Sequence, residues 1–141
     1  MKRTETKQLP IPEKDRKWHL IDLSGQILGR GVTGIAGLLT GKTKTLYAPH
    51  TDCGDYVIAI NAGKIKVTGQ KLQNKRYYRH TGYPTGLRQI VLGELMEKDP
   101  AKVIRLAVLG MLPQNKLRAL RIKRLKVFAD QNHIYSEKFK S

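Results

Sequence analysis

The chain has 141 residues and is 40% hydrophobic, which predicts a single folded domain with a modest core and excludes a wholly disordered chain. Its 27 Lys and Arg residues face only 11 Asp and Glu residues, so the formal net charge is +16, and we expect a polyanionic partner to offset the self-repulsion. The one cysteine excludes an internal disulfide and no apolar run could span a bilayer, so we expect a cytoplasmic protein without a membrane partner.

The N-terminal half predicts an extended arm followed by alternating strands and helices. Residues 1–16 are polar and contain two prolines, whereas 17–141 read as one domain without a linker. We expect a strand at 18–22, a helix from about 29 to 40 with apolar residues spaced i, i+3, i+4, i+7, and a buried strand at 55–60. A further short strand is expected at 65–68. Lys42 and Lys44 follow the helix as two exposed cations.

The stretch from Lys71 to Arg88 carries the strongest functional signal. It holds five Lys or Arg residues, one His and three Tyr, and no acidic residue. Cations bind phosphates, and aromatic rings stack on unpaired bases, so the stretch predicts a nucleic-acid contact surface. Gly82, Pro84 and Gly86 predict a loop in its middle, flanked by strands at 75–79 and 87–92 that could pair. For Tyr77 or Tyr78 taken singly, packing on the core is an equal alternative.

The C-terminal part predicts a capped helix and then a second basic block. We expect a helical turn at 94–98. Asp99 and Pro100 then suit the start of a second helix, which ends before Pro113. Cations alternate with leucines in the block 114–126, where a helix would keep some leucines inward and spread its cations over the remaining surface. A strand at 125–128 and a polar tail complete the chain. Strands alternating with helices indicate an α/β fold with a mostly parallel sheet.

Three motifs suggest other functions, and the residues argue against each of them. Gly29-x-Gly31-x-x-Gly34 has the spacing of a dinucleotide-binding loop, but the preceding strand ends several residues too early and a second mononucleotide half is missing. Cys53 lies near His50 in the sequence, yet nothing indicates an oriented base, so we expect no catalytic residue. The four histidines lack metal-ligand spacing, so we expect neither a metal nor another cofactor.

Several ordered segments resemble the bacterial-type large-subunit ribosomal protein L-thirteen family. They include 18–22 (WHLID), 28–30 (LGR), 39–42 (LTGK), 54–57 (GDYV), 68–71 (TGQK), 77–84 (YYRHTGYP) and 110–113 (GMLP). The resemblance implies a three-layer α/β/α fold with a central, mainly parallel sheet. It also implies a non-catalytic constituent of the large ribosomal subunit that binds large-subunit rRNA, supports early assembly and meets neighbouring ribosomal proteins. Whether that ribosome is bacterial or organellar stays open.

The residues and the resemblance together give one set of expected rRNA contacts. The set is Arg30, Lys42, Lys44, Lys71, Lys75, Arg76, Tyr77, Tyr78, Arg79, His80, Tyr83, Arg88, Lys116, Arg118, Arg121, Lys123, Arg124 and Lys126. The chain departs from the family pattern at Leu109 and at Arg118, where a basic and a small residue are expected, and the second change favours a continuous helix after Asn115. Thr85 replaces one of two loop glycines. Two alternatives remain, a small nucleotide-binding enzyme that uses Gly29–Gly34 and a free RNA-binding regulator.

Overall fold

The structure is a computed structural model that describes residues 11–139. Short 3-10 helices are labelled η. The elements follow in this order: η1 (Glu13–Asp15), β1 (Trp18–Asp22), α1 (Leu28–Thr40), β2 (Tyr56–Ile60), η2 (Ala62–Lys64), α2 (Lys71–Asn74), β3 (Arg76–His80), β4 (Leu87–Val91), α3 (Leu92–Lys98), α4 (Pro100–Met111), α5 (Arg118–Lys123), β5 (Leu125–Val127) and η3 (Ser136–Phe139).

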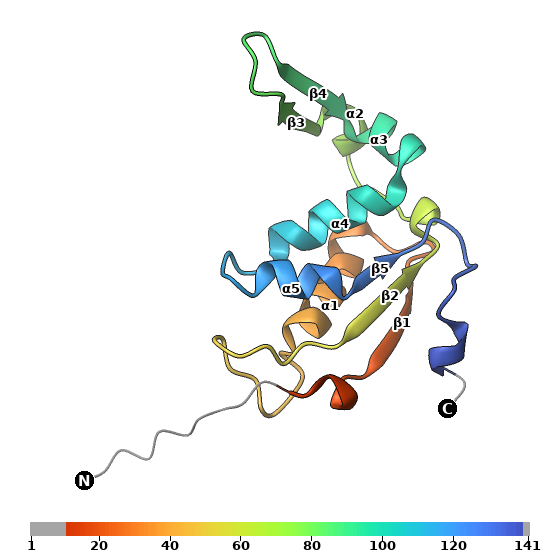
Figure 1. Cartoon of the computed structure of the whole chain (residues 1–141). Helices are drawn as coiled ribbons and strands as arrows, with labels where there is room; N and C mark the ends of the chain where they lie inside the picture. Colours follow the sequence, from red (N-terminus) through yellow and green to blue (C-terminus); the bar gives the residue numbers. More distant parts are fainter. Residues whose placement is uncertain (1–10, 140–141) are drawn as a thin grey trace.

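Strands β1, β2 and β5 form a parallel sheet with β2 in the middle (Figure 1). In its register Trp18 pairs with Tyr56, and Val57 pairs with Leu125. Strand β2 is apolar on both of its faces, which suits the central position, and Val57, Ile58 and Ala59 are fully buried. The expected α/β fold with a mainly parallel sheet is confirmed. A second sheet is the antiparallel hairpin of β3 and β4, which projects from the body.

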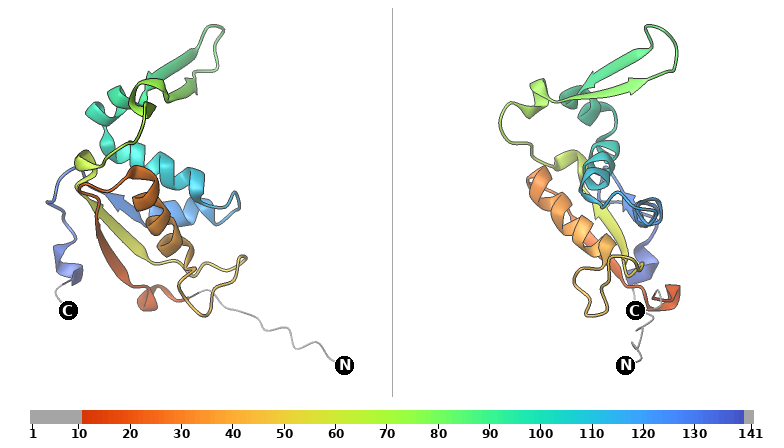
Figure 2. Two further views of the ribbon diagram at one scale, coloured as in Figure 1. Left: turned by 180° about the vertical axis from the view of Figure 1, so that it is seen from behind. Right: turned by 90° about the vertical axis from the view of Figure 1, so that its left-hand side faces the viewer.

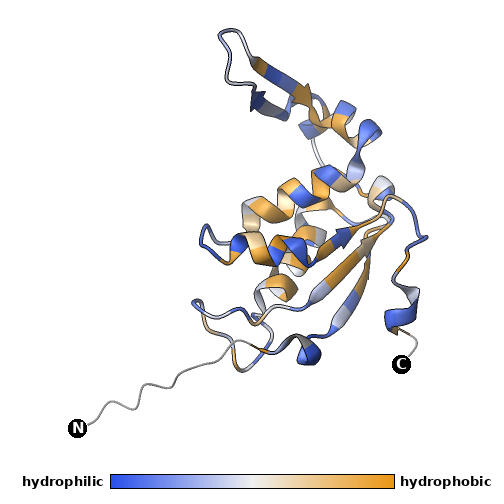
Figure 3. Cartoon of the chain, in the orientation of Figure 1, coloured by the Kyte–Doolittle hydropathy of each residue, from blue (hydrophilic) through white to orange (hydrophobic). Residues whose placement is uncertain are grey.

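One face of the parallel sheet is covered by α1 and α4, which pack against each other. Strand β2 turns Val57 and Ala59 toward this core, and Figure 3 shows apolar residues concentrated where these elements meet. Each fully buried Val, Leu or Ile side chain contributes about 1.5–3 kcal/mol relative to exposure. From the two helices the fully buried members are Val32, Ile35, Leu39, Val103, Ile104 and Val108.

The opposite face is partly covered by the C-terminal segment, as the views in Figure 2 show, and Leu20 on that face is 46% exposed. The Trp18 ring stacks on Tyr56 with centroids 4.3 Å apart, and Tyr135 stacks on the same indole at 5.6 Å. Phe128 meets Tyr135 edge-on at 6.2 Å. The third layer is therefore an irregular segment that ends in η3 rather than a long helix. The tail that composition marks as polar is anchored by its aromatic residues.

The two long helices begin and end as the sequence predicts. In α4 the Asp99 carboxylate accepts a hydrogen bond from the Lys102 amide at 3.0 Å, and Pro100 occupies the first turn. Helix α1 ends at Gly41, whose φ of +79° closes the helix in the left-handed region. A Cβ on Gly41 would lie 2.6 Å from the carbonyl oxygen of Cys53, so glycine is required there.

Two expected elements are wrong. The strand at 65–68 is a single bridge between Ile27 and Lys66, because Gly69, with φ +68°, turns the chain away before a ladder can form. The continuous helix over 114–126 is replaced by a turn and the six-residue α5. Asn115 holds that turn, since its side-chain oxygen accepts from the Leu117 amide at 3.2 Å and its carbonyl accepts from the Arg118 amide at 3.1 Å.

The expected arm is described only in its last part, because residues 1–10 lie outside the described range. Residues 13–15 form η1, and the Arg16 guanidinium donates to the carbonyl of Gly54 and, at 3.3 Å, to the Asp52 carboxylate. These contacts tie the end of the arm to the loop that precedes β2. The division of the chain at residue 16 stays a prediction.

Candidate nucleic-acid interface

The stretch from Lys71 to Arg88 is mostly a regular β-hairpin preceded by the short helix α2. Alternating side chains place Tyr77 and Ile90 on the hairpin face that packs against the core, whereas Arg76, Tyr78 and His80 lie on the other face. The expected pairing of the two flanking segments is confirmed, with Tyr78 opposite Gln89. Regular pairing makes this surface a projecting rod, and only residues 81–86 form a loop at its tip.

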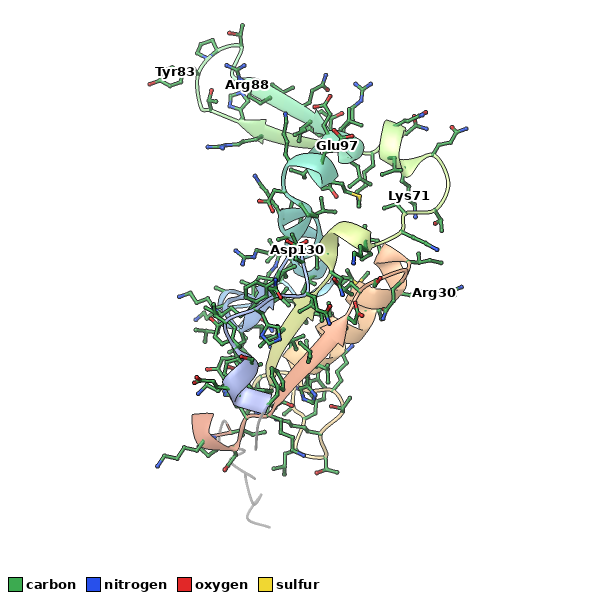
Figure 4. The ribbon with its side chains drawn as sticks, turned by 90° about the vertical axis from the view of Figure 1, so that its right-hand side faces the viewer. Arg30, Lys71, Tyr83, Arg88, Glu97 and Asp130 are labelled. Carbon is green, nitrogen blue, oxygen red and sulfur yellow. The ribbon has the colours of Figure 1, made fainter. Side chains whose placement is uncertain are left out.

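The hairpin presents its cations and two of its three tyrosines to solvent. Tyr78 is 64% exposed and Tyr83, at the tip in Figure 4, is 75% exposed. Tyr77 is half-buried, so it follows the core-packing alternative, and the Lys75 ammonium lies 5.4 Å from its ring centroid. All five cations of the stretch are exposed: Lys71, Lys75, Arg76, Arg79 and Arg88.

The tip of the hairpin is closed by local hydrogen bonds. The Gly82 amide donates to Nδ1 of His80 at 2.9 Å, and the Gly86 amide donates to the Tyr83 carbonyl at 2.9 Å. Gly82 has φ +88°, and Thr85 has φ +62°, an unfavourable value for a β-branched residue. Thr85 thus has the left-handed conformation, which glycine would adopt without steric cost. The tip holds exposed Tyr83 in a defined turn.

The second basic block differs from its expected arrangement. In α5 and the residue after it, Arg121 is 1% exposed and Arg124 is 8% exposed, whereas Leu120 is 49% exposed. The expectation that these two arginines lie on the outer surface is wrong. The physical reason is Asp52, whose carboxylate accepts from both terminal nitrogens of Arg124, at 2.7 and 2.5 Å. Arg121 points to the same loop and donates to the Thr51 carbonyl at 3.4 Å.

Asp52 is the centre of a cationic cluster that sequence reasoning missed. Burial raises the pKa of Asp52, but the hydrogen bonds and charge of Arg124, together with the charges of Arg16 and Arg121, lower the pKa below its usual value overall. Three arginines surround one carboxylate, and the Nε atoms of Arg121 and Arg124 have no hydrogen-bond partner within residues 11–139. The cluster fixes the loop before β2 against α5. The only signal of this cluster in the sequence is the presence of two acidic residues, Asp52 and Asp55, within 52–55.

Lys44 is also held by a carboxylate, so it is not the free cation that the sequence suggests. Its Nζ lies 2.5 Å from Oδ1 of Asp55, and Nε2 of His19 lies 3.1 Å from Oδ2. Burial raises the pKa of Asp55. Hydrogen bonds from Lys44, His19 and the Lys17 amide lower this pKa by more than burial raises it, so it lies below its ordinary value. Asp55 thereby joins β1 to the loop after α1.

The other assigned cations are distributed over the body. Arg30, Lys42, Lys116 and Lys123 are exposed, whereas Lys126 is half-buried. The Arg118 guanidinium donates to the Leu109 carbonyl at 2.7 Å and so caps the C-terminal end of α4. Arg118 and Leu109 are the two residues that depart from the family pattern. In Figure 1 the hairpin projects from one side of α4 and α5 lies on its other side. Helix α4 therefore lies between the two basic segments.

The nucleotide-loop motif has no counterpart in the structure. Gly29, Gly31 and Gly34 all lie inside α1 without positive φ values, so they form no phosphate-binding loop between a strand and a helix. Cys53 is 1% exposed and packs near the Thr51 hydroxyl. Within residues 11–139 no group of three or more His, Cys, Asp or Glu side chains could hold a metal ion. No helix in that range is both long and apolar enough to cross a membrane.

Comparison with known proteins identifies the family. Residues 16–134 match the family model described as Ribosomal protein L13. The large ribosomal subunit protein uL13 of Thermobifida fusca is 54% identical over 118 residues, which cover 84% of this chain and 79% of that protein. The proteins of the same name from a Nitratiruptor species and from Geobacter sulfurreducens are 49% and 48% identical, covering 96% and 91% of this chain and 96% and 90% of theirs. The chain belongs to the ribosomal protein L13 family.

Proposed function

We propose that this chain is a structural constituent of the large ribosomal subunit that binds large-subunit rRNA. The observation that carries the proposal is the projecting hairpin, whose exposed cations and tyrosines lie in a stretch, 56–93, without a single acidic residue. The names of the relatives support the same conclusion. The proposal makes the chain a non-enzymatic component, located in the ribosome.

Three physical properties of the hairpin suit this role. Lys and Arg side chains displace counterions from phosphates, which supplies affinity without requiring a particular base sequence. Exposed Tyr78 and Tyr83 offer flat faces on which unpaired bases of RNA can stack. Because the hairpin is a narrow rod, it can enter a crevice between RNA helices that the body of the protein could not. Phosphate neutralisation at such a junction would favour early subunit assembly.

Neighbouring large-subunit proteins complete the proposed set of partners. An exposed apolar side chain such as Ile134, at 81%, or Leu46, at 63%, is better suited to a protein surface than to a phosphate. These residues lie away from the hairpin, on the C-terminal segment and on the loop after α1. We therefore assign RNA contact first to the hairpin.

The proposal is tested by sedimentation and by salt dependence. A tagged chain should sediment with large subunits, and its affinity for a fragment of large-subunit rRNA should fall steeply as salt rises. Arg76→Ala should reduce the slope of log affinity against log salt by about 0.7–0.9, the value for one lost phosphate contact. Lys14→Ala is the matched control, since Lys14 is an exposed cation on η1 and outside the assigned set. Arg124→Ala is unsuitable, because it would also break the pair with Asp52.

The alternatives predict different results. A free RNA-binding regulator would remain in the ribosome-free fraction, and a nucleotide-binding enzyme would bind a mononucleotide saturably and lose it in Gly31→Val. Absence from large subunits, together with a salt slope that Arg76→Ala leaves unchanged, would contradict the proposed function.

A further inference from the structure

A cavity of about 350 Å³ lies where the hairpin leaves the body of the protein. Its walls come from the hairpin and the two helices that follow it in the chain: Arg79 and Arg88 from the hairpin, Leu95 from α3, and Lys102 and Leu106 from α4. The arrangement of these elements is visible in Figure 1, and Figure 4 labels Arg88 on the hairpin. Lys102 lies outside the expected set of rRNA contacts.

The charge around the cavity is unbalanced. Arg79 and Arg88 are directly opposite each other across the two strands, an arrangement of like charges that destabilises a hairpin. Lys102 adds a third cation from α4, and none of the residues that line the cavity is acidic. No ion pair joins any of the three cations to another residue in the described range. An anion placed between them would remove the repulsion.

The floor of the cavity is apolar and aromatic. Ile90, Leu95 and Leu106 line it together with Tyr77, which is the cross-strand neighbour of Ile90. The Tyr77 hydroxyl oxygen is buried and has no hydrogen-bond partner within residues 11–139. A buried hydroxyl without a partner is unfavourable, so a ligand with a polar edge that reached it would be stabilised. The site therefore combines a cationic rim, an apolar floor and an unused polar group.

We propose that this cavity binds one unpaired nucleotide of an RNA strand, with its phosphate held by Arg79, Arg88 and Lys102 and its base over the floor that contains Tyr77. This proposal rests on the proposed function and extends it to a specific mode of contact. A single nucleotide is the fitting ligand because a phosphate needs the cationic rim, a base needs the apolar floor, and the volume is near the lower end of the range for ligand cavities. A strand is favoured over a free nucleotide because the other hairpin cations hold it nearby and raise its effective concentration.

The first test compares variants of the full chain for binding to a labelled ten-nucleotide oligouridine. Lys102→Ala should weaken binding about three- to tenfold, as expected for a lost charge-assisted contact that is partly solvated. Arg105→Ala is the matched control, since Arg105 is an exposed cation one turn further along α4 that does not line the cavity, and it should change affinity less than twofold. If Arg88 and Lys102 share one phosphate, the double alanine variant should lose less than the product of the two single effects.

A second measurement locates the nucleotide. On addition of oligouridine, the amide NMR signals of Ile90 and Leu95 should shift, and Tyr77→Phe, which removes the unpaired hydroxyl, should reduce the affinity while the chain stays folded. Equal effects of Lys102→Ala and Arg105→Ala, with unshifted cavity signals in a chain that still binds the oligonucleotide, would overturn the cavity proposal and leave the proposed function intact. Uridine monophosphate binding as tightly as the strand would overturn the assignment to a strand. A wild-type chain that fails to bind RNA would overturn both proposals.

Discussion

Replacing Asp52 by Asn should destabilise the fold much more than its location in an irregular loop suggests. The change removes the negative charge that faces Arg124, Arg16 and Arg121, but keeps the size of the side chain. Breaking a buried ion pair by removing one partner costs about 3–5 kcal/mol. The side chains of Asp52 and Arg124 are 12% and 9% exposed, and the amide oxygen of Asn can still accept one hydrogen bond, so we expect a loss of about 2–3 kcal/mol in the free energy of unfolding.

Urea unfolding at pH 7 measures this loss. With a denaturant dependence of about 1–3 kcal/mol per molar for a small domain, the midpoint should fall by roughly 0.7–3 M. Asp130→Asn is the matched control, because Asp130 is exposed and the substitution raises the net charge equally. The control should change stability by less than about 0.5 kcal/mol, as surface substitutions usually do. Equal unfolding midpoints for the two variants would refute the argument that Asp52 holds the arginine cluster.

Acidification provides a second check on the same residue. The folded-state pKa of Asp52 lies below its ordinary value, so its contribution to stability is present above the unfolded-state pKa, about 3.9, and is lost as pH falls through the lower folded-state pKa. The difference between wild type and Asp52→Asn should therefore stay constant from pH 7 to about pH 5. It should shrink only as the pH falls below about 4. A difference that disappears near neutral pH would contradict the assignment.

Two further predictions concern the packing and capping of the helices. Gly54→Ala should severely destabilise the chain, because the added Cβ would lie 1.8 Å from the Leu39 carbonyl oxygen. Gly34→Ala lies in open space inside α1 and should stabilise the chain by up to about 1 kcal/mol. Thermal unfolding of both variants checks this contrast, and a stabilised Gly54→Ala variant would contradict it. Asp99→Ala should cost about 1 kcal/mol by removing the N-cap of α4, measured by urea unfolding, with Asp99→Asn retaining most of the stability; equal losses in both variants would speak against capping.

The elements with a strong local pattern were predictable. Apolar spacing and the Asp99–Pro100 start located α1 and α4, because a helix has to bury one face and cap its first amides. The apolar run of β2 indicated a central strand for a similar reason. The expectation at 65–68 failed because pairing partners are decided by the path of the chain around Gly69 rather than by β-propensity.

The candidate site divides in the same way. Acid-free composition located the hairpin as a cationic surface, because excess charge of one sign stays in solvent unless a carboxylate approaches. Arg124 and Lys44 do meet carboxylates, from residues 72 and 11 positions away in the sequence, and Arg121 is buried beside the same loop. The cavity at Lys102 likewise unites the hairpin with α4, which a linear pattern does not reveal.

By itself, the sequence determined the fold class, the family resemblance and the presence of a basic, tyrosine-bearing surface, since periodicity and composition reflect which residues face the core and which face solvent. Only the tertiary structure decided which cations remain free. Two carboxylates on one loop, Asp52 and Asp55, hold Arg124 and Lys44 internally, and the folding of the chain brings those charges together. The energy of a charge depends on its nearest opposite charge and on its exposure to water, and both are properties of the packed molecule.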